Sequence, residues 1–178
     1  LGDEHTAIDK IQHLHAQMTQ SETYEKISSE AKQKIKDLQA SINPKEQNNV
    51  LLNLLIPSDS LFKSGSAQLN ERAADQILNF AEVLEPVKNK VRIEITGHTD
   101  SIPPAVGSEF IDNWQLSTER ANAVARTFIN IGFNGKVIEV NGRSSYDPLF
   151  DERDENGKWI KANLARNRRV EIVVKQAF

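Results

Sequence analysis

The chain has 178 residues, of which 38% are hydrophobic, which is enough for one domain with an ordinary core and a short additional segment, and excludes two large domains. The formal net charge of -3 argues against a general electrostatic attraction to nucleic acid. There is no cysteine, which excludes disulfides and thiolate metal sites, and no apolar run approaches the roughly 18 to 20 residues that cross a bilayer. Because the chain starts with Leu1 and shows no signal-peptide pattern, we expect a soluble fragment of a longer protein.

Residues 1–43 are predicted to form one amphipathic helix or two consecutive ones. Apolar residues recur there at steps of three and four, and the segment has no proline. Thr19 and Glu22 fit a capping box, which would mark a break between two helices. Asn43 and Pro44 end the segment, because a residue before proline disfavours the α region. We expect the apolar stripe to pair with another helix or to pack along the domain.

Residues 50–56 are a short, almost continuous apolar run, which predicts a strand covered on both faces, with a helix as the alternative. Residues 69–84 have apolar positions at helical spacing, with Asn70 near the start and Pro86 just past the end. The loop between the two contains Phe62. We interpret its ring either as an apolar wall for a ligand or as a core residue.

The stretch 91–100 is the best-patterned strand of the sequence. Val91, Ile93 and Ile95 alternate with polar residues, as in a strand with one buried face. Gly97 breaks the pattern, and polar side chains follow it. Open α/β sheets bind ligands at the carboxyl ends of their strands, so we expect any functional site here.

Asp112, with Gln115 three residues later, predicts the start of a second helix, which Gly132 closes. At about 100° per residue, Arg120 lies at the border of the apolar stripe of this helix. Its guanidinium is therefore expected to reach the edge of the sheet.

Residues 137–140 predict a third strand, residues 143–163 a long polar connection, and residues 170–174 a last strand. The order predicts an α/β (α+β) fold, a two-layer sandwich in which a mixed β-α-β-α-β-β sheet has its helices on one face. The other face is expected to be largely solvated, because four polar residues alternate along the strands: Arg92, Glu94, Glu139 and Glu171.

Asp100 and Arg120 are the candidate site that the charges themselves suggest. A carboxylate and a guanidinium held apart at one rim form a receptor for a zwitterion, since one binds an ammonium and the other a carboxylate. The alternative is that both form structural salt bridges, with each other or with neighbours. We expect no metal or other cofactor, because His98 and Asp100 have no second ligand cluster near them in the sequence. His98 is expected to order the turn by hydrogen bonds.

Three blocks, in order, resemble the signature of OmpA-like peptidoglycan-binding domains: Thr-Gly-His-Thr-Asp at 96–100, Asn-Trp-Gln-Leu-Ser-Thr-Glu-Arg-Ala at 113–121, and Asn-Arg-Arg-Val-Glu-Ile at 167–172. The resemblance covers roughly residues 50–175. It implies that Asp100 and Arg120 bind the diaminopimelate of the cell-wall peptide. Further ligand contacts are expected from Thr99, Asn113, Leu116, Asn167, Arg169 and Phe62. An alternative interpretation is that Arg166, Arg168 and Arg169 bind phosphate.

The long connection between Asp100 and Asn113 is most similar to that of flagellar stator subunits of the MotB and PomB type. This implies a periplasmic domain of an inner-membrane protein, with residues 1–45 as a helical linker or interaction segment and residues 46–178 as the wall-binding domain. Its expected partners are peptidoglycan, a second copy in a homodimer and the A-type membrane subunit of the stator.

Two alternatives remain at this stage. One is the peptidoglycan-binding domain of an OmpA-type porin or a Pal-type lipoprotein with no role in motility. The other is a hydrolase that uses His98 and Asp100 as base and orienting group. The sequence has no nucleophile or oxyanion motif to support a hydrolase, so we expect a binding domain and not an enzyme.

Overall fold

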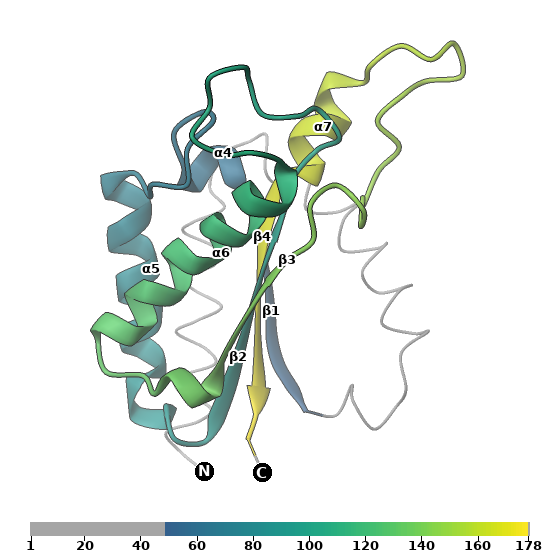
Figure 1. Cartoon of the computed structure of the whole chain (residues 1–178). Helices are drawn as coiled ribbons and strands as arrows, with labels where there is room; N and C mark the ends of the chain where they lie inside the picture. The colour runs from purple at the N-terminus through teal and green to yellow at the C-terminus, as the bar shows by residue number, and fades with distance from the viewer. Residues whose placement is uncertain (1–48, 178) are drawn as a thin grey trace.

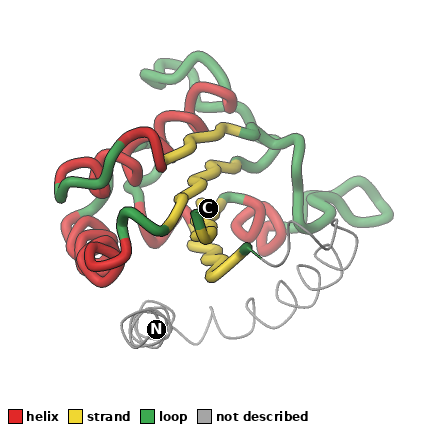
Figure 2. The backbone as a smooth tube through the Cα atoms, turned by 90° about the horizontal axis from the view of Figure 1, so that it is seen from below, coloured by secondary structure: helices red, strands yellow, loops and turns green. Residues whose placement is uncertain are grey.

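The structure, a computed structural model, describes residues 49–177, which form a four-stranded mixed sheet with the two long helices on one face (Figures 1 and 2). The strands are β1 (Val50–Pro57), β2 (Val91–His98), β3 (Ile138–Gly142) and β4 (Arg169–Gln176). The helices are α4 (Ser58–Leu61), α5 (Glu71–Leu84), α6 (Asn113–Asn130) and α7 (Lys161–Asn167), with 3-10 turns η1 (Glu85–Val87) and η2 (Gly135–Val137). The predicted fold class is confirmed. The helical segment predicted for residues 1–45 lies outside the described residues.

The strand order is β1-β4-β2-β3. β4 is antiparallel to both β1 and β2, while β2 and β3 are parallel neighbours joined through α6. Ile172 of β4 lies opposite Leu54 on one side and Ile95 on the other. The last strand of the chain is therefore an inner strand of the sheet.

Side-chain caps fix the starts of both long helices. The Asn70 carboxamide accepts a hydrogen bond from the Ala73 amide at 2.8 Å, and the Asp112 carboxylate accepts one from the Gln115 amide at 2.8 Å. Each cap satisfies an amide that has no partner within its helix. The Gln115 side chain in turn accepts from the Ile111 amide at 2.7 Å. The sequence-based starts of these helices are confirmed.

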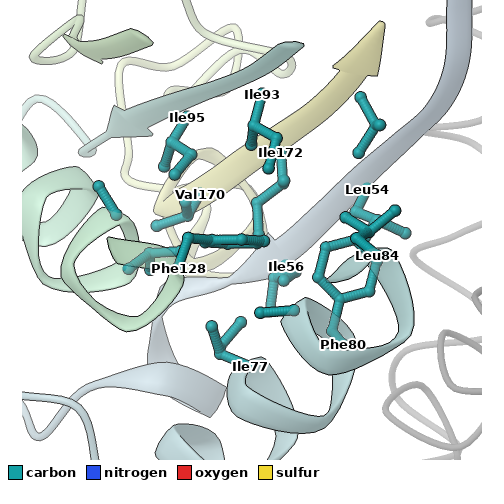
Figure 3. Packing of buried hydrophobic residues seen from close by; sticks show 14 of the residues in the cluster. Leu54, Ile56, Ile77, Phe80, Leu84, Ile93, Ile95, Phe128, Val170 and Ile172 are labelled. Atoms are coloured by element: carbon teal, nitrogen blue, oxygen red, sulfur yellow. The ribbon is translucent and has the colours of Figure 1, made fainter. Parts of the chain in front are cut away.

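The core lies between the sheet and the two long helices (Figure 3). Phe80 of α5 and Phe128 of α6 meet edge to face with ring centroids 5.9 Å apart, and both are fully buried. Ile93 and Ile95 of β2 point into the same cluster, as their alternation predicts. Burying each such side chain stabilises the fold by about 1.5 to 3 kcal/mol.

Two predictions about secondary structure are confirmed in part. Residues 50–56 do form a strand, at the edge of the sheet. Leu54 and Ile56 on one face are buried, whereas on the other face Leu51 is 38% exposed and Asn53 and Leu55 are half-buried. The connection 143–163 was predicted as a long polar loop, and α7 begins near its end, at Lys161.

The solvated face is found only in part. Arg92 and Glu139 are exposed as expected, whereas Glu94 is half-buried and accepts a hydrogen bond from Lys175 Nζ at 2.7 Å. Glu171, also half-buried, is paired with Arg169 at 2.8 Å.

Candidate functional site

The start of α6 lies unusually close to the carboxyl ends of β2 and β3. A Cβ on Gly97 would lie 2.0 Å from the Ser117 carbonyl oxygen, and one on Gly142 would lie 2.1 Å from Thr118 Oγ1. Ser117 Oγ also accepts a hydrogen bond from the Ser144 amide at 3.0 Å. Only glycine allows this approach, which brings the polar turn after β2 against the first turns of α6.

Hydrogen bonds fix this turn on both sides of Asp100. The Thr99 amide donates to the Ser144 carbonyl at 2.8 Å, and Asp100 Oδ1 accepts from the Ile102 amide at 3.0 Å. The half-buried Asn113 side chain donates to the carbonyls of Asp100 and Ile102 at 3.1 and 3.0 Å. Asn113 therefore ties the start of α6 to the residue that is expected to bind the ligand.

Arg168, at the junction of α7 and β4, bridges two carboxylates. Its Nη1 lies 2.7 Å from Asp100 Oδ2, and its Nη2 lies 2.9 Å from Asp59 Oδ2 in α4. Burial alone would lower the pKa of Arg168, but the hydrogen bonds to Asp59 and Asp100 outweigh it and raise the pKa above its usual value. Arg168 is therefore a permanent cation at this site.

Arg120 is buried, with only 5% of its surface exposed. Its Nε donates to the Ser66 carbonyl at 3.0 Å, and its guanidinium carbon lies 5.2 Å from the centre of the Phe62 ring. Burial lowers its pKa, and the carboxylates of Asp59 and Asp100 oppose that effect. Nη1 has no hydrogen-bond partner among residues 49–177. A buried guanidinium with a free N–H is a ready donor for an incoming acceptor.

Asp59, Asp100, Arg120 and Arg168 form what we call the charge cluster. It gathers at one end of the sheet, where α4, the connection after β2, the start of α6 and α7 meet (Figure 1). The two carboxylates and two guanidiniums sum to no net charge. Within the described part of the chain Asp100 and Arg120 make no direct ion pair, so the salt-bridge alternative holds for Asp100 with Arg168 and not for the pair that the sequence suggested.

The structure brings Thr99, Asn113 and Phe62 to the charge cluster and buries them to different degrees. Thr99 is buried, and its Oγ1 has no partner among the described residues. Phe62 belongs to the hydrophobic core and also lies against the Arg120 guanidinium, so it matches both interpretations of its ring. Leu116 is buried beneath the first turn of α6.

Asn167 and Arg169, in contrast, are buried in internal contacts. The Asn167 side chain accepts from the amides of Leu149 and Phe150 at 2.9 and 3.0 Å and so holds the long connection in place. Arg169 pairs with Glu171 at 2.8 Å and donates to a backbone carbonyl at 3.2 Å. Burial lowers the pKa of Arg169, and Glu171 opposes the shift. The arginine that reaches the charge cluster is Arg168, which the sequence reasoning did not select.

His98 is buried and neutral. Burial, followed by the charges of Arg169 and Arg143, lowers its pKa from 6.5 to about 3. Its Nε2 lies 3.5 Å from Glu171, and neither ring nitrogen makes a hydrogen bond to the described residues. The prediction that His98 orders the turn by hydrogen bonds was wrong. Residues 49–177 contain no cluster of three metal-ligating side chains, and none of their helices is long and apolar enough to span a bilayer.

Two open hollows lie beside the charge cluster. One, of about 700 Å³, begins at Ser66, the residue that accepts from Arg120, and passes between Phe110 and Arg126. The other, of about 440 Å³, lies between Ser101 and Trp159. The surface of the first hollow is mainly polar, and that of the second is mainly apolar.

Comparison with known proteins identifies the family. Residues 61–161 match the OmpA family. The chain is 36% identical over 115 residues to Motility protein B of Escherichia coli (strain K12), which covers 64% of this chain and 34% of that protein. It is 32% identical over 126 residues to Probable lipoprotein YiaD of the same organism, a match that covers 71% of this chain and 51% of that protein. The crystal structure of a putative MotB-like protein from Desulfovibrio vulgaris matches with a TM-score of 0.61 and 26% identity, over 88% of this chain and 100% of that one.

The chain thus spans about a third of the length of Motility protein B and about half that of YiaD. The match includes the turn after β2 and the start of α6, which supply Asp100 and Arg120. The resemblance stated from the sequence blocks is confirmed: the chain belongs to the OmpA family, and its relatives include motility proteins of the MotB type.

Proposed function

We propose that the chain is a non-catalytic domain that binds the peptide stem of peptidoglycan through the charge cluster. The observation that supports this most directly is the buried Arg120 guanidinium, whose Nη1 has no hydrogen-bond partner among residues 49–177 and which interacts electrostatically with the carboxylates of Asp59 and Asp100. A zwitterionic ligand adds one charge of each sign to the site, so the cluster stays balanced when the ligand binds.

In this proposal the ligand is the diaminopimelate of the stem. Its free carboxylate accepts from Arg120, whose position over Phe62 and on the Ser66 carbonyl is already fixed. Its ammonium binds to Asp100. Arg168 keeps two hydrogen bonds to Asp59, so it stays anchored when Asp100 turns to the ligand. Both guanidiniums are therefore held in place before the ligand binds, which favours affinity.

A co-sedimentation assay with purified peptidoglycan tests the proposal. Asp100→Asn and Arg120→Gln are each expected to reduce bound protein at least tenfold, since truncating one partner of a desolvated charge pair costs about 2 to 5 kcal/mol. Asp75→Asn and Arg72→Gln, which remove exposed charges of the same kind on α5, are the matched controls. Circular dichroism verifies that each variant folds. Unchanged sedimentation of both site variants would refute the proposal, and release of soluble wall fragments would indicate an enzyme instead.

The relatives support a more specific role. We propose that the chain anchors a flagellar stator to the wall as the periplasmic domain of an inner-membrane protein, together with a second copy and an A-type membrane subunit. The similarity to Motility protein B favours this. In the same proposal residues 1–45 form the linker and residues 46–178 the binding domain.

The similarity to a lipoprotein favours the second candidate, a porin or lipoprotein domain with no link to motility. A chimera separates the two: this chain replaces the corresponding part of Motility protein B in cells that lack it. Swimming in soft agar is expected for a stator domain. A chimera that binds the wall but gives no swimming supports the second candidate.

A further inference from the structure

Two exposed aromatic rings follow residues that contact the turn after β2. Trp114 comes after Asn113, which donates to the Asp100 carbonyl, and Tyr146 comes two residues after Ser144, whose carbonyl accepts from the Thr99 amide. Trp114 and Tyr146 stack with ring centroids 5.3 Å apart and planes at 22°. Trp114 is 48% exposed and Tyr146 is 75% exposed. Tryptophan and tyrosine are enriched at binding surfaces, because each combines an apolar ring with a hydrogen-bonding group.

The two rings come from distant segments that the fold holds firmly. Trp114 belongs to the first turn of α6, and its carbonyl accepts from Ser117 Oγ at 3.0 Å and Thr118 Oγ1 at 2.8 Å. Tyr146 follows Ser144, whose amide donates to the same Ser117 hydroxyl. Ser144 has φ 53°, a left-handed conformation that turns the chain sharply before Tyr146. The pair is therefore a preformed surface, which loses little conformational entropy on binding.

The surroundings of the rings are polar. The chain neighbours of Trp114 are Asn113 and Gln115, and those of Tyr146 are Ser145 and Asp147. Because the rings stack on each other, each keeps one outer face free, and such a face bordered by hydrogen-bonding groups matches a sugar, whose C–H face is apolar and whose rim is polar. A protein partner needs about 800 Å² on each side for a stable interface, far more than two rings supply.

The spacing along α6 links these rings to the proposed stem site. Trp114 and Arg120 are six residues apart, which is about 9 Å along the helix axis. Three residues of an extended peptide span about 10 Å. A stem whose third residue lies at Arg120 thus brings the sugar that bears the stem to the height of Trp114 along the axis, and it passes around α6 to reach that ring, because the two side chains project about 120° apart.

We propose that the Trp114–Tyr146 pair is a saccharide platform that stacks against the amino sugar to which the peptide stem is attached. The inference rests on the proposed function. It assigns two contacts to one ligand, a charged contact at the peptide and an apolar contact at the glycan. Since the two parts are covalently joined, the second contact forms at a high effective concentration.

Binding is measured with two probes on the full chain: a diaminopimelate-containing tripeptide, and the same tripeptide attached to N-acetylmuramic acid. The sugar is expected to tighten binding roughly 3- to 10-fold, the range of one aromatic stacking contact. Tyr146→Ala and Trp114→Ala should remove this gain and leave the affinity for the bare tripeptide unchanged. Trp159→Ala, an exposed tryptophan that stacks on Arg153, is the matched control.

Fluorescence supplies a direct readout, because the chain has two tryptophans. In Trp159→Phe all tryptophan emission comes from Trp114, and the sugar-bearing probe should change it while the bare tripeptide should not. The platform is overturned if Tyr146→Ala and Trp114→Ala still bind the sugar-bearing probe more tightly than the bare tripeptide. If these variants also lose self-association, the rings belong to a protein interface instead. If neither probe binds the wild-type chain, the proposed function itself fails.

Discussion

Replacing Gly97 by alanine should destabilise the fold and disturb the proposed site together. The added Cβ would lie 2.0 Å from the Ser117 carbonyl oxygen, where at least 3.0 Å is needed, so β2 and α6 must separate by about 1 Å along that line. The obstacle is backbone and not a flexible side chain. The cost should therefore reach the upper end of the overpacking range, about 3 kcal/mol, or about 10 °C in Tm for a domain of this size.

The assay is urea unfolding followed by circular dichroism, with Gly135→Ala as the matched control. A Cβ on Gly135 meets nothing within 4 Å, and its φ lies outside the left-handed region. Gly135→Ala should be neutral or stabilising by up to about 1 kcal/mol, since alanine restricts the unfolded chain.

Gly97→Ala should also weaken peptidoglycan binding, because the shift moves the turn of α6 that precedes Arg120. Equal stabilities of Gly97→Ala and Gly135→Ala would refute the argument that glycine sets the distance between β2 and α6. Loss of stability with unchanged binding would show that the charge cluster does not depend on that distance.

Two further predictions concern the charged groups. His98, with a folded pKa of about 3 against 6.5 unfolded, binds no proton in the native state, so its contribution to stability is complete above pH 6.5 and declines as pH falls toward 3. Between pH 6.5 and 4.5 the free energy of unfolding, measured with urea, should fall by about 2 kcal/mol more in the wild type than in His98→Gln. Stability curves that run parallel in this pH range would contradict the argument. Arg168→Gln removes the cation that occupies Asp100, so calorimetry should show tighter binding of free diaminopimelate, by a few-fold at low salt. Weaker binding would mean that Arg168 itself contacts the ligand.

The sequence predicted the periodic elements well and the tertiary pairings poorly. α5 and α6 have apolar stripes and capping residues that are visible in the sequence, and β2 has a strict alternation. For β1 the strand was predicted correctly and its covering only in part, because an apolar run does not reveal how deeply each face of the strand is buried. α7 was missed because its seven residues give too few turns for a periodic signal.

The site could be predicted only where a motif supplied it. Asp100 and Arg120 lie in sequence blocks that resemble the family signature. Asp59 lies 109 residues from Arg168 and in no block, so no local pattern could pair them. The sequence held one usable signal for Arg168. Side chains alternate along a strand, so Arg168 and Arg169 lie on opposite faces, and Arg169 shares its face with its partner Glu171.

The inner position of β4 has a consequence for how the chain folds. β1 and β2 run in the same direction and leave a gap one strand wide, which only residues 169–176 fill. During synthesis the facing edges of β1 and β2 therefore stay unpaired until residues 169–176 have left the ribosome, and the long-range pairing that follows is slow. A chain shortened by its last ten residues would lose the centre of its sheet and not merely a tail, and it would expose two open edges to aggregation.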